Sequence, residues 1–530
     1  MLLAVLAIAA ATGSVQGARK LAGDLRYETG PRVDPSVFGA ADIVHSSDEP
    51  GRAVLFDQSV LPSDYDTCYV ETWRPKVLRI ARPYDGASFP RNIAPPLFRW
   101  DDQQSDVWQL SLKAPGWTEP LRVITDAQQW RPDEAAWERM KASDTGEWIE
   151  MEVRGCRLDG TRRRGDTVYA DSVSFRVSPH SADPIIVYRL VSPLFHGFKT
   201  PDIHYRDITA FETRMFLPGK DTYCTNCHSF PLSPDIPTED VSLAIAVRDQ
   251  LVPETQRRIL GLYNFDSQLG KTLNINSFFM SWSPEGRAVA VTGGYRVTVR
   301  PLVTLETQEF YVLTADIMIV DSKTLEVQPL QGASEPEYME SFPTWSPDGQ
   351  TIVFARAKEI TIEEGFAERR FNLYRVPYNN GRGGVAQPIP GASHNEMSNY
   401  APRFSPDGKW LVFNQADWSS LVAPTADLWI VSTEDGAMPR KLECNVPYAM
   451  DSHHSWSSNG RWLLFASKRD DGIFARVYLT EIDEDGHASP PVELPTIEDN
   501  MMCYNVPEFL RCRAHIDAED ILAKTSFLAE

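Results

Sequence analysis

The chain has 530 residues, of which 42% are hydrophobic and 24% are charged, and these proportions exclude a disordered protein. The length is too great for one hydrophobic core and indicates roughly two to four domains. The formal net charge of −21 at pH 7 argues against nucleic acid and anionic membrane surfaces as partners. Such a charge is explained either by solubility or by electrostatic steering toward a basic partner.

The N-terminal segment has an apolar run from Leu2 to Ala11, which is too short to span a bilayer. Small residues follow, and then Arg19 and Lys20. Although no positive residue precedes the apolar run, this order predicts a signal peptide over residues 1–17. We therefore expect an exported protein, periplasmic or at the cell surface, that does not span the membrane.

The next two segments differ in patterning. Residues 18–77 are irregular in composition and are expected to form an extended leader. From 78 to 184, short apolar runs recur between turn signals, and Trp108, Leu110 and Leu112 alternate with polar neighbours. Period-two alternation predicts antiparallel strands with one buried face. About a hundred residues of this pattern predict an immunoglobulin-like β-sandwich.

The second half of the chain repeats one pattern. The copies are "FFMSWSPEGRAVAVT" from 278, "SFPTWSPDGQTIVFA" from 341, "NYAPRFSPDGKWLVFN" from 399 and "DSHHSWSSNGRWLLFA" from 451. Each copy is typical of a strand that ends near an aromatic residue, a tight turn that contains glycine, and a second strand. The turns are far enough apart for four strands per repeat, which predicts a β-propeller of five or six blades over 224–515. Residues 185–223 are expected to connect it to the sandwich, and 516–530 to form a C-terminal tail.

These W-S-P-D-G strand-turn-strand units resemble the repeats of the periplasmic Tol-type β-propeller proteins, over roughly residues 225 to 500. With the sandwich, the resemblance implies an all-β fold: an immunoglobulin-like β-sandwich followed by a five- or six-bladed β-propeller. It says little about function, because such propellers serve as scaffolds, binders and enzyme caps.

The run "YCTNCHSF" from 223 contains Cys224 and Cys227, with His228 directly after the second cysteine. Zinc would need two further thiolate or imidazole ligands at short spacing, and the sequence has no second Cys-x-x-Cys. A thioredoxin-like redox pair belongs in a βαβ context, and a structural disulfide would leave the histidine unexplained. Covalent haem accounts for all three residues, through two thioether bonds and one imidazole bond to iron. We therefore expect one covalent haem c, with His228 as the proximal ligand.

The opposite iron ligand is predicted by aligning the repeats. If Phe230 is the aromatic residue of an earlier blade, then His228 stands two positions before it. The equivalent positions of the other repeats hold Met280, Pro343, Pro402 and His454. Because the last blade of a closed ring neighbours the first, His454 is the favoured distal ligand and Met280 the alternative. Further candidates are His453, His196, His204 and Met215.

Cationic side chains near the motif include Arg189, Arg206 and Lys220. Haem propionates favour such donors, arginine in particular. Arg206 is the preferred candidate for a propionate contact, although a solvent-facing charge also explains each of the three.

A second resemblance covers residues 185 to 510. The segments "VYRLVSPLFHGFKTPDIHYRDI" and "HHSWSSNGRWLLFASKRDDG" resemble a family of exported bacterial propeller proteins that carry one haem-attachment motif. The resemblance implies a monohaem propeller. The "SPD" after Phe230 continues as "IPTE" without the usual glycine, so the first blade is expected to be irregular.

Three functions fit these features. The preferred hypothesis is electron transfer by an exported monohaem c-type cytochrome, with a redox partner protein of basic surface and no nucleic acid partner. The alternatives are a haem-stabilised scaffold that binds an envelope partner or a glycan, and a haem enzyme or sensor with an open iron site. A propeller-capped serine hydrolase is disfavoured, because no G-x-S-x-G motif occurs.

Overall fold

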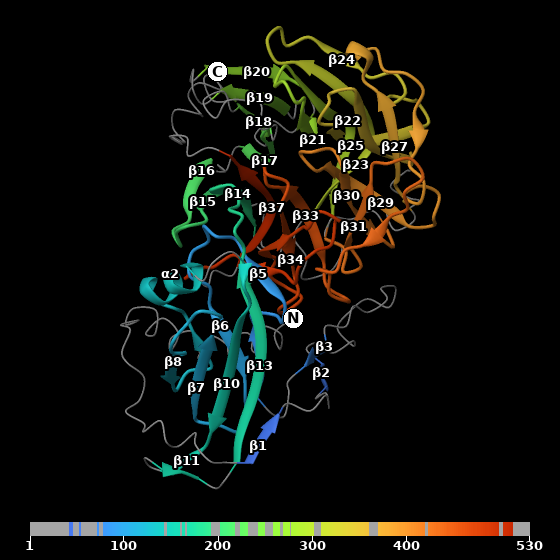
Figure 1. Cartoon of the computed structure of the whole chain (residues 1–530). Helices are drawn as coiled ribbons and strands as arrows, with labels where there is room; N and C mark the ends of the chain where they lie inside the picture. Colours follow the sequence, from blue (N-terminus) through green and yellow to red (C-terminus); the bar gives the residue numbers. More distant parts are fainter. Residues whose placement is uncertain are drawn as a thin grey trace, which may run out of the picture.

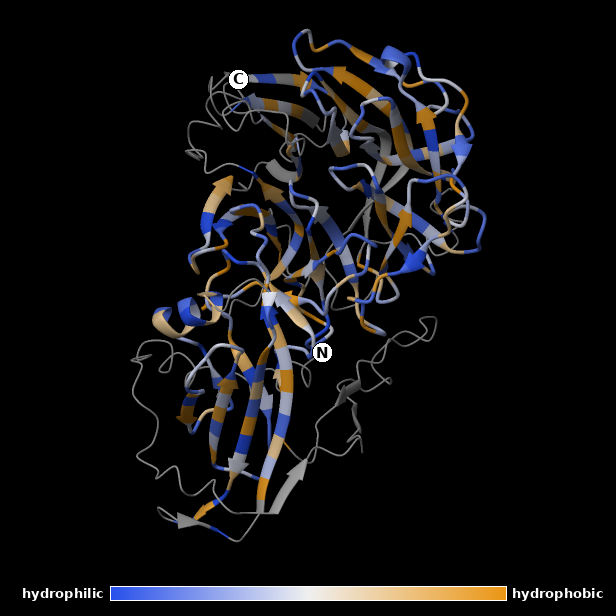
Figure 2. Ribbon diagram, viewed as in Figure 1, coloured by the Kyte–Doolittle hydropathy of each residue, from blue (hydrophilic) through white to orange (hydrophobic). Residues whose placement is uncertain are grey.

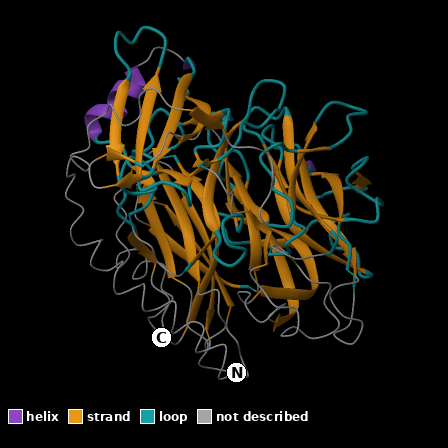
Figure 3. Cartoon of the chain, turned by 90° about the horizontal axis from the view of Figure 1, so that it is seen from below, coloured by secondary structure: helices purple, strands orange, loops and turns teal. Residues whose placement is uncertain are grey.

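The structure is a computed structural model with two β-rich parts, an N-terminal sandwich and a propeller. In Figure 1 the sandwich lies at the bottom and the propeller at the top. It describes residues 42–45, 52–54, 71–73, 78–142, 146–159, 162–164, 167–191, 202–217, 223–231, 242–249, 258–264, 269–275, 277–300, 309–359, 369–418, 422–497 and 502–511. Strands dominate both parts, as Figure 3 shows, and the helix α2 (Glu134–Ala142) belongs to the sandwich. Within these ranges no helix is both long and apolar enough to cross a membrane.

The N-terminal part consists of two β-sheets, which confirms the sandwich predicted from the sequence. The larger sheet has the order β1-β13-β10-β7-β8, with β5 beside β13, and the smaller has the order β4-β6-β9. Their strands are β1 (Asp42–His45), β4 (Arg79–Arg82), β5 (Ala87–Phe89), β6 (Phe98–Asp101), β7 (Val107–Lys113), β8 (Leu121–Thr125), β9 (Gln129–Trp130), β10 (Ile149–Cys156) and β13 (Thr167–Val177). The central strands β7, β10 and β13 are antiparallel, as expected.

Hydrophobic and polar residues alternate along β10 and β13 in Figure 2. Trp108, Leu110 and Leu112 of β7 are buried, as their alternation predicted. Two further strands of the larger sheet are not antiparallel: β1 and β5 both pair with β13 in parallel. Because β1 lies within 18–77, part of the expected leader is a strand of the sandwich. Two separate two-stranded sheets pair β2 (Arg52–Val54) with β3 (Glu71–Trp73) and β11 (Leu158–Asp159) with β12 (Arg162–Arg163).

The propeller contains six four-stranded sheets among the described residues, here called blades I to VI. From the inner strand outward they are I, β17 (Tyr223–Ser229), β18 (Ser242–Asp249), β19 (Arg258–Asn264), β20 (Leu269–Asn274); II, β21 (Ser277–Trp282), β22 (Ala288–Arg300), β23 (Glu309–Asp321), β24 (Val327–Pro329); III, β25 (Tyr338–Trp345), β26 (Thr351–Lys358), β27 (Asn372–Pro377), β28 (Gln387–Pro388); IV, β29 (Ser398–Phe404), β30 (Trp410–Ala416), β31 (Asp427–Ser432), β32 (Arg440–Lys441); V, β33 (Asp451–Trp456), β34 (Trp462–Ser467), β35 (Arg476–Glu481), β36 (Val492–Glu493); and VI, β37 (Cys503–Leu510), β14 (Ile185–Val191), β15 (Asp202–Asp207), β16 (Arg214–Leu217). Each inner strand packs against the inner strand of the next blade from I through to VI.

Blade VI joins the two ends of the propeller. Its inner strand β37 follows blade V in the chain, whereas β14, β15 and β16 precede blade I. The range 185–223 is therefore not only a connector, because it supplies three strands of a blade. Pairing of β14 with β37 closes the ring by backbone hydrogen bonds and makes β14 an interior strand of its sheet. Closure also decides between the five and six blades expected from the sequence, in favour of six.

The turn glycines of the repeats have the backbone that the motif predicted. Gly286, Gly349, Gly408 and Gly460 all have φ between 68° and 73°. A side chain at these positions would be strained, because φ in this region favours glycine. The same turns close by hydrogen bonds, as where the Gly349 amide donates to the Ser346 carbonyl at 2.9 Å.

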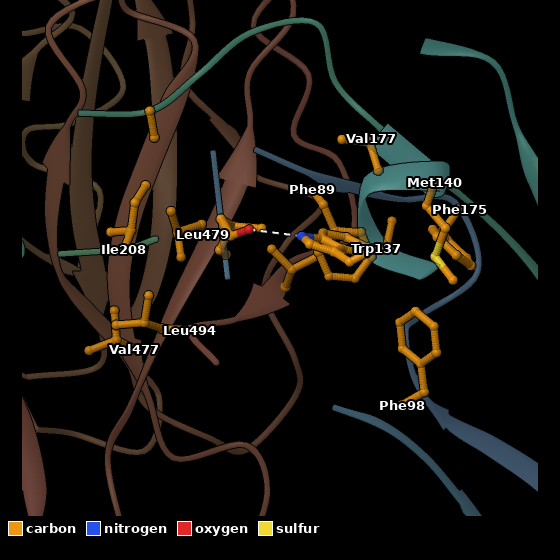
Figure 4. Close-up of a cluster of buried hydrophobic side chains, with 14 of the residues drawn as sticks. Phe89, Phe98, Trp137, Met140, Phe175, Val177, Ile208, Val477, Leu479 and Leu494 are labelled. Atoms are coloured by element: carbon orange, nitrogen blue, oxygen red, sulfur yellow. Dashed lines mark hydrogen bonds between the residues drawn. The ribbon is translucent and has the colours of Figure 1, made fainter. Parts of the chain in front are cut away.

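The sandwich and the propeller share one hydrophobic cluster, drawn in Figure 4. Trp137 of α2 and Phe175 of β13 lie on the sandwich side of the cluster. Val477 and Leu479 of β35, together with Leu494, lie on the side of blade V. The two parts therefore pack through a common core rather than meeting at a polar surface.

A buried carboxylate strengthens the same interface. Glu481 of blade V accepts hydrogen bonds from the hydroxyls of Ser88 (2.6 Å) and Ser178 (2.5 Å) of the sandwich. The Arg176 guanidinium lies 3.1 Å from the same carboxylate. Because a buried charge without partners is unfavourable, this set of partners favours one fixed docking of the two parts.

Blade III buries a second carboxyl group, and this group should make stability depend on pH. Glu340 is 0% exposed and lies 3.0 Å from the Arg356 guanidinium. Burial raises the pKa of Glu340 from 4.5 to about 8, against the opposing effect of Arg356. The folded chain therefore keeps this proton to higher pH than the unfolded chain does. The free energy of unfolding should consequently fall as pH rises between these two values.

We expect Glu340→Gln to remove this pH dependence. The free energy of unfolding of the variant, relative to that of the parent, should rise by about 2 kcal/mol between pH 5 and pH 7. Urea titrations at several pH values measure this difference. Replacement of the exposed Glu434 by glutamine is the control and should leave the slope unchanged. A difference that stays flat across this range would show that Glu340 is ionised in the folded chain.

Candidate functional site

The Cys-x-x-Cys-His run lies on β17, the inner strand of blade I. The strand pairs with β18 from Tyr223 to Ser229, and its register shifts between Thr225 and His228. Such a shift is a β-bulge, which turns side chains away from the simple alternation of a strand. Cys224 belongs to this strand, but its side chain lies outside the described residues. Two of the three expected haem-binding side chains, those of Cys227 and His228, are described.

Indole hydrogen bonds between blades identify equivalent residues. In three blades a tryptophan donates its Nε1–H to the carbonyl of the preceding blade: Trp345 to Ser281 (3.1 Å), Trp456 to Arg403 (3.3 Å) and Trp282 to Ser229 (3.1 Å). In the first two pairs the accepting residue directly precedes the aromatic residue of its own repeat. Phe230 directly follows Ser229 and so occupies the aromatic position of blade I. These contacts support the alignment that matches His228 with Met280 and His454.

All six inner strands shift register at the same level. In five of them one residue at the shift has a left-handed backbone: Phe279 (φ 24°), Phe342 (φ 54°), Ala401 (φ 51°), His453 (φ 55°) and Val506 (φ 51°). Such a backbone is unfavourable for these residue types and persists only where the surrounding structure holds it. We call these five residues, together with Cys227 of blade I, the bulge ring. They surround the propeller axis because the inner strands do.

Cys227 contacts the next member of the bulge ring. Its side chain is 7% exposed, and the Phe279 amide donates a hydrogen bond to the thiol. Burial raises the pKa of Cys227, while the Phe279 amide and the Arg189 guanidinium lower it. Phe279 in turn stacks on Phe342 with 4.0 Å between ring centroids. Members of the bulge ring in blades I, II and III thus lie against one another.

His228 lies beside the interface between blades VI and I. It is 2% exposed, and its ring lies 5.9 Å from that of Phe230. Phe230 packs in a hydrophobic cluster with Phe216 of blade VI and with Ile245, the cross-strand partner of His228. The imidazole therefore lies next to this cluster and is shielded from water.

The two expected distal ligands lie in other interfaces. Met280 is 2% exposed and packs between blades I and II with Ala244 and Leu260. His454 is 4% exposed, and its Nε2 donates a hydrogen bond to the Val412 carbonyl of blade IV at 3.2 Å. The two side chains thus lie in different blade interfaces, and Met280 shares its buried cluster with Cys227 of the haem motif.

His453 is the histidine that belongs to the bulge ring. It is 9% exposed, and its Nε2 has no hydrogen-bond partner in the described part of the chain. Burial lowers the pKa of His453 to about 3, and the charges of Arg189 and Lys468 act in the same direction. The sequence analysis gave His453 only as a further candidate for the distal iron ligand, after His454 and Met280. In the repeat alignment His453 stands one position before His454, which is the position that Phe279 occupies relative to Met280. This equivalence could have identified His453 as a bulge-ring residue.

The cationic candidates are distributed over blade VI. Arg206, the expected propionate donor, is buried on β15, two strands outward from the axis strand β37. Arg189 is 9% exposed on β14, next to that strand, and is the nearer charge to Cys227. Arg403 forms an ion pair with Glu508 at 2.9 Å, and burial raises the pKa of Glu508 to about 7. Lys220 lies outside the described residues.

Two of the remaining candidate ligands lie on strands away from the inner strand of blade VI. His204 lies on β15 and Met215 on the outermost strand β16, where Met215 is 41% exposed. His196 and the "SPDIPTE" stretch expected to be irregular lie outside the described residues. In the described ranges, no group of three or more His, Cys, Asp or Glu side chains is placed to hold a metal ion.

A groove of about 460 Å³ opens between blades III and IV. Its lining includes the turn carboxylates Asp348 and Asp407 and the cation Arg375. Asp348 and Asp407 accept hydrogen bonds from the serines of their own turns, at 2.5 and 2.6 Å. These carboxylates therefore serve the repeat turns, and the groove shares no lining residue with β17.

Comparison with known proteins finds only distant similarity to solved structures. No protein-family model matches the chain, and no curated protein sequence matches it significantly. Similar solved structures include an oligogalacturonate lyase in complex with manganese (15% identity, TM-score 0.35, covering 59% of this chain and 73% of that chain). An oligogalacturonate lyase from Vibrio parahaemolyticus is similar at 15% identity and a TM-score of 0.33, with the same coverage of 59% and 73%. The β-propeller domain of the trilobed protease from Pyrococcus furiosus is similar at 12% identity and a TM-score of 0.29, covering 51% of this chain and 72% of that chain.

Proposed function

We propose that this chain is an exported c-type cytochrome, which carries one covalent haem on the inner strand of blade I and transfers electrons to a protein partner. The observation that carries the proposal is the place of the Cys-x-x-Cys-His run on an axis strand, with Cys227 and His228 both more than nine-tenths buried. A haem bound there supplies a one-electron couple between ferrous and ferric iron.

The donor chemistry of the described residues fits this group. Cys227 offers a thiol for a thioether bond, and His228 offers the adjacent imidazole for iron. Nε2 of His453 is a buried imidazole nitrogen with no hydrogen-bond partner in the described ranges, and His453 belongs to the same bulge ring as Cys227. The Arg189 guanidinium is a charged neighbour of Cys227, and guanidinium groups suit haem propionates.

Each residue of the motif has a defined task in this proposal. The thiols of Cys224 and Cys227 would each add across one vinyl group, so that sulfur bonds to one carbon and hydrogen to the other. His228 would bind the iron, and its burial would keep water away from that bond. The closed ring of blades holds these groups on a rigid strand, which limits rearrangement when the charge of the iron changes.

The acidic composition supports a basic protein partner. The formal net charge of −21 would steer such a partner toward this chain, and added salt would screen the attraction. The apolar N-terminal run supports export, which haem attachment of this type requires.

The test is maturation of the full chain with haem-attachment machinery. We expect the intact mass to rise by one haem and the pyridine haemochrome spectrum to be that of a c-type haem. The matched Cys224→Ser/Cys227→Ser variant should fold to the same circular dichroism spectrum and lose all covalent haem. Unaltered mass in the exported parent chain, or a mass two hydrogens lower from a Cys224–Cys227 disulfide, would refute the proposal. Haem that cannot be reversibly reduced would instead indicate a structural role.

A further inference from the structure

His453 and His454 are neighbours on β33, yet their surroundings differ. His454 donates a hydrogen bond from Nε2 to the Val412 carbonyl, which fixes its ring against blade IV. His453 is only 9% exposed, and its Nε2 has no hydrogen-bond partner among the described residues. A buried polar nitrogen without a hydrogen bond is unfavourable, because burial removes its hydrogen bonds to water and no protein group replaces them. Nε2 of His453 is therefore available to bind a group from outside the described residues. Nδ1 of His454 also has no partner among those residues, but the ring of His454 is already held through its Nε2.

The backbone places His453 at the propeller axis. Its φ of 55° is the left-handed value shared by Phe279 and Phe342, the bulge-ring residues of blades II and III. Those two rings stack on each other, and the Phe279 amide contacts the Cys227 thiol. Residues of the bulge ring thus gather at one level, and this level includes one cysteine of the haem motif. His453 is the member of that ring contributed by blade V.

One buried guanidinium relates His453 to the haem motif. Blade VI lies between blades V and I, and its Arg189 pairs across strands with Asn505 of β37. Arg189 is 9% exposed and is a charged neighbour of both Cys227 and His453. Cys227 and His453 therefore lie within electrostatic reach of the same group, on either side of blade VI in the ring.

We propose that His453, rather than His454 or Met280, is the second axial ligand of the haem iron. This inference rests on the proposed function, and it assigns the open nitrogen of His453 to the iron of a porphyrin joined to β17. An imidazole is a strong iron ligand, and two imidazoles give a low-spin iron with a lower reduction potential than an imidazole and a thioether. His454 is then a structural histidine that holds blade V against blade IV.

The experiment compares two neighbouring histidines in the full, haem-loaded chain. In His453→Ala we expect the covalent haem to remain, the low-spin six-coordinate spectrum to be lost, and the reduced protein to bind carbon monoxide. Added imidazole should restore the low-spin spectrum. His454→Ala is the matched control and should keep the six-coordinate spectrum and exclude carbon monoxide. His453→Gln retains a polar side chain of similar size and should behave as His453→Ala does. Agreement between the two variants would show that the spectral change does not result from misfolding of the alanine variant.

The outcomes separate this inference from the proposed function. A His453→Ala or His453→Gln protein that carries covalent haem and stays six-coordinate would overturn the assignment and leave the haem proposal standing. A parent protein that carries covalent haem but binds carbon monoxide would do the same. A parent chain without covalent haem would overturn both.

Discussion

Replacement of Asp451 by alanine is expected to lower the free energy of unfolding by about 3–5 kcal/mol, because it leaves a buried arginine without its counter-charge. Asp451 begins the inner strand of blade V, and its carboxylate lies 2.7 Å from the Arg469 guanidinium. The two side chains are 0% and 1% exposed. No water can solvate the remaining charge at such a depth without disturbing the blade.

The surroundings of Arg469 make this loss hard to relieve. Its guanidinium also donates to the Cys444 carbonyl at 2.8 Å and lies 4.6 Å from the centre of the Tyr478 ring. Tyr478 donates its hydroxyl to Asp470, which pairs with Arg82 of the sandwich. The ion pair is thus one end of a polar network that extends across the interface between the two parts.

A double-mutant cycle with urea unfolding measures the effect. The double variant Asp451→Ala/Arg469→Met should be more stable than the sum of the two single losses predicts, because it removes both charges together. The exposed pair of Arg461 and Glu484 is the control, since the Glu484 side chain is 80% exposed. Glu484→Ala should change stability by less than about 1 kcal/mol. A loss below 1 kcal/mol in Asp451→Ala would show that the pair contributes no more than a surface contact.

Replacement of Trp137 by alanine, as a separate single substitution, is expected to lower the free energy of unfolding by about 3–5 kcal/mol, the usual loss for a buried tryptophan. Trp137 is 1% exposed, and its Nε1 donates to the Ile93 carbonyl at 2.9 Å. Its ring meets that of Phe89 edge to face with 5.7 Å between centroids. Figure 4 shows the tryptophan within the cluster that joins the sandwich to blade V. The cavity would therefore open in a core that both parts share.

The control for this prediction is a tryptophan of the same sandwich that lies at the surface. Trp148 is 45% exposed and lies under the Arg176 guanidinium, 5.3 Å from the ring centre. Trp148→Ala should cost no more than about 1 kcal/mol. Calorimetry of both variants also tests whether the two parts unfold together. A Trp137→Ala protein whose propeller transition is unchanged would show that the sandwich is not needed to stabilise blade V.

Local patterns in the sequence determined the strands and their turns. The alternation of Trp108, Leu110 and Leu112 predicted a half-buried strand because side chains of a strand alternate between two faces. The glycine of each W-S-P-D-G unit predicted a left-handed turn because other residues are strained there, and Gly286 and Gly349 have that backbone. The alignment of Phe230 with the tryptophans of later repeats, now supported by indole hydrogen bonds, also came from the sequence alone. These features depend on residues that are neighbours in the sequence, and they can therefore be predicted from the sequence.

Only the tertiary structure decided which distant segments meet. Blade VI has no repeat motif because its inner strand, β37, and its second strand, β14, are joined by hydrogen bonds and not by a turn. The different surroundings of His453 and His454 were likewise not predictable, because one extra residue at the bulge breaks the regular alternation of side chains along the strand. Ring closure and bulge geometry arise from packing between blades, and a linear pattern does not encode them residue by residue.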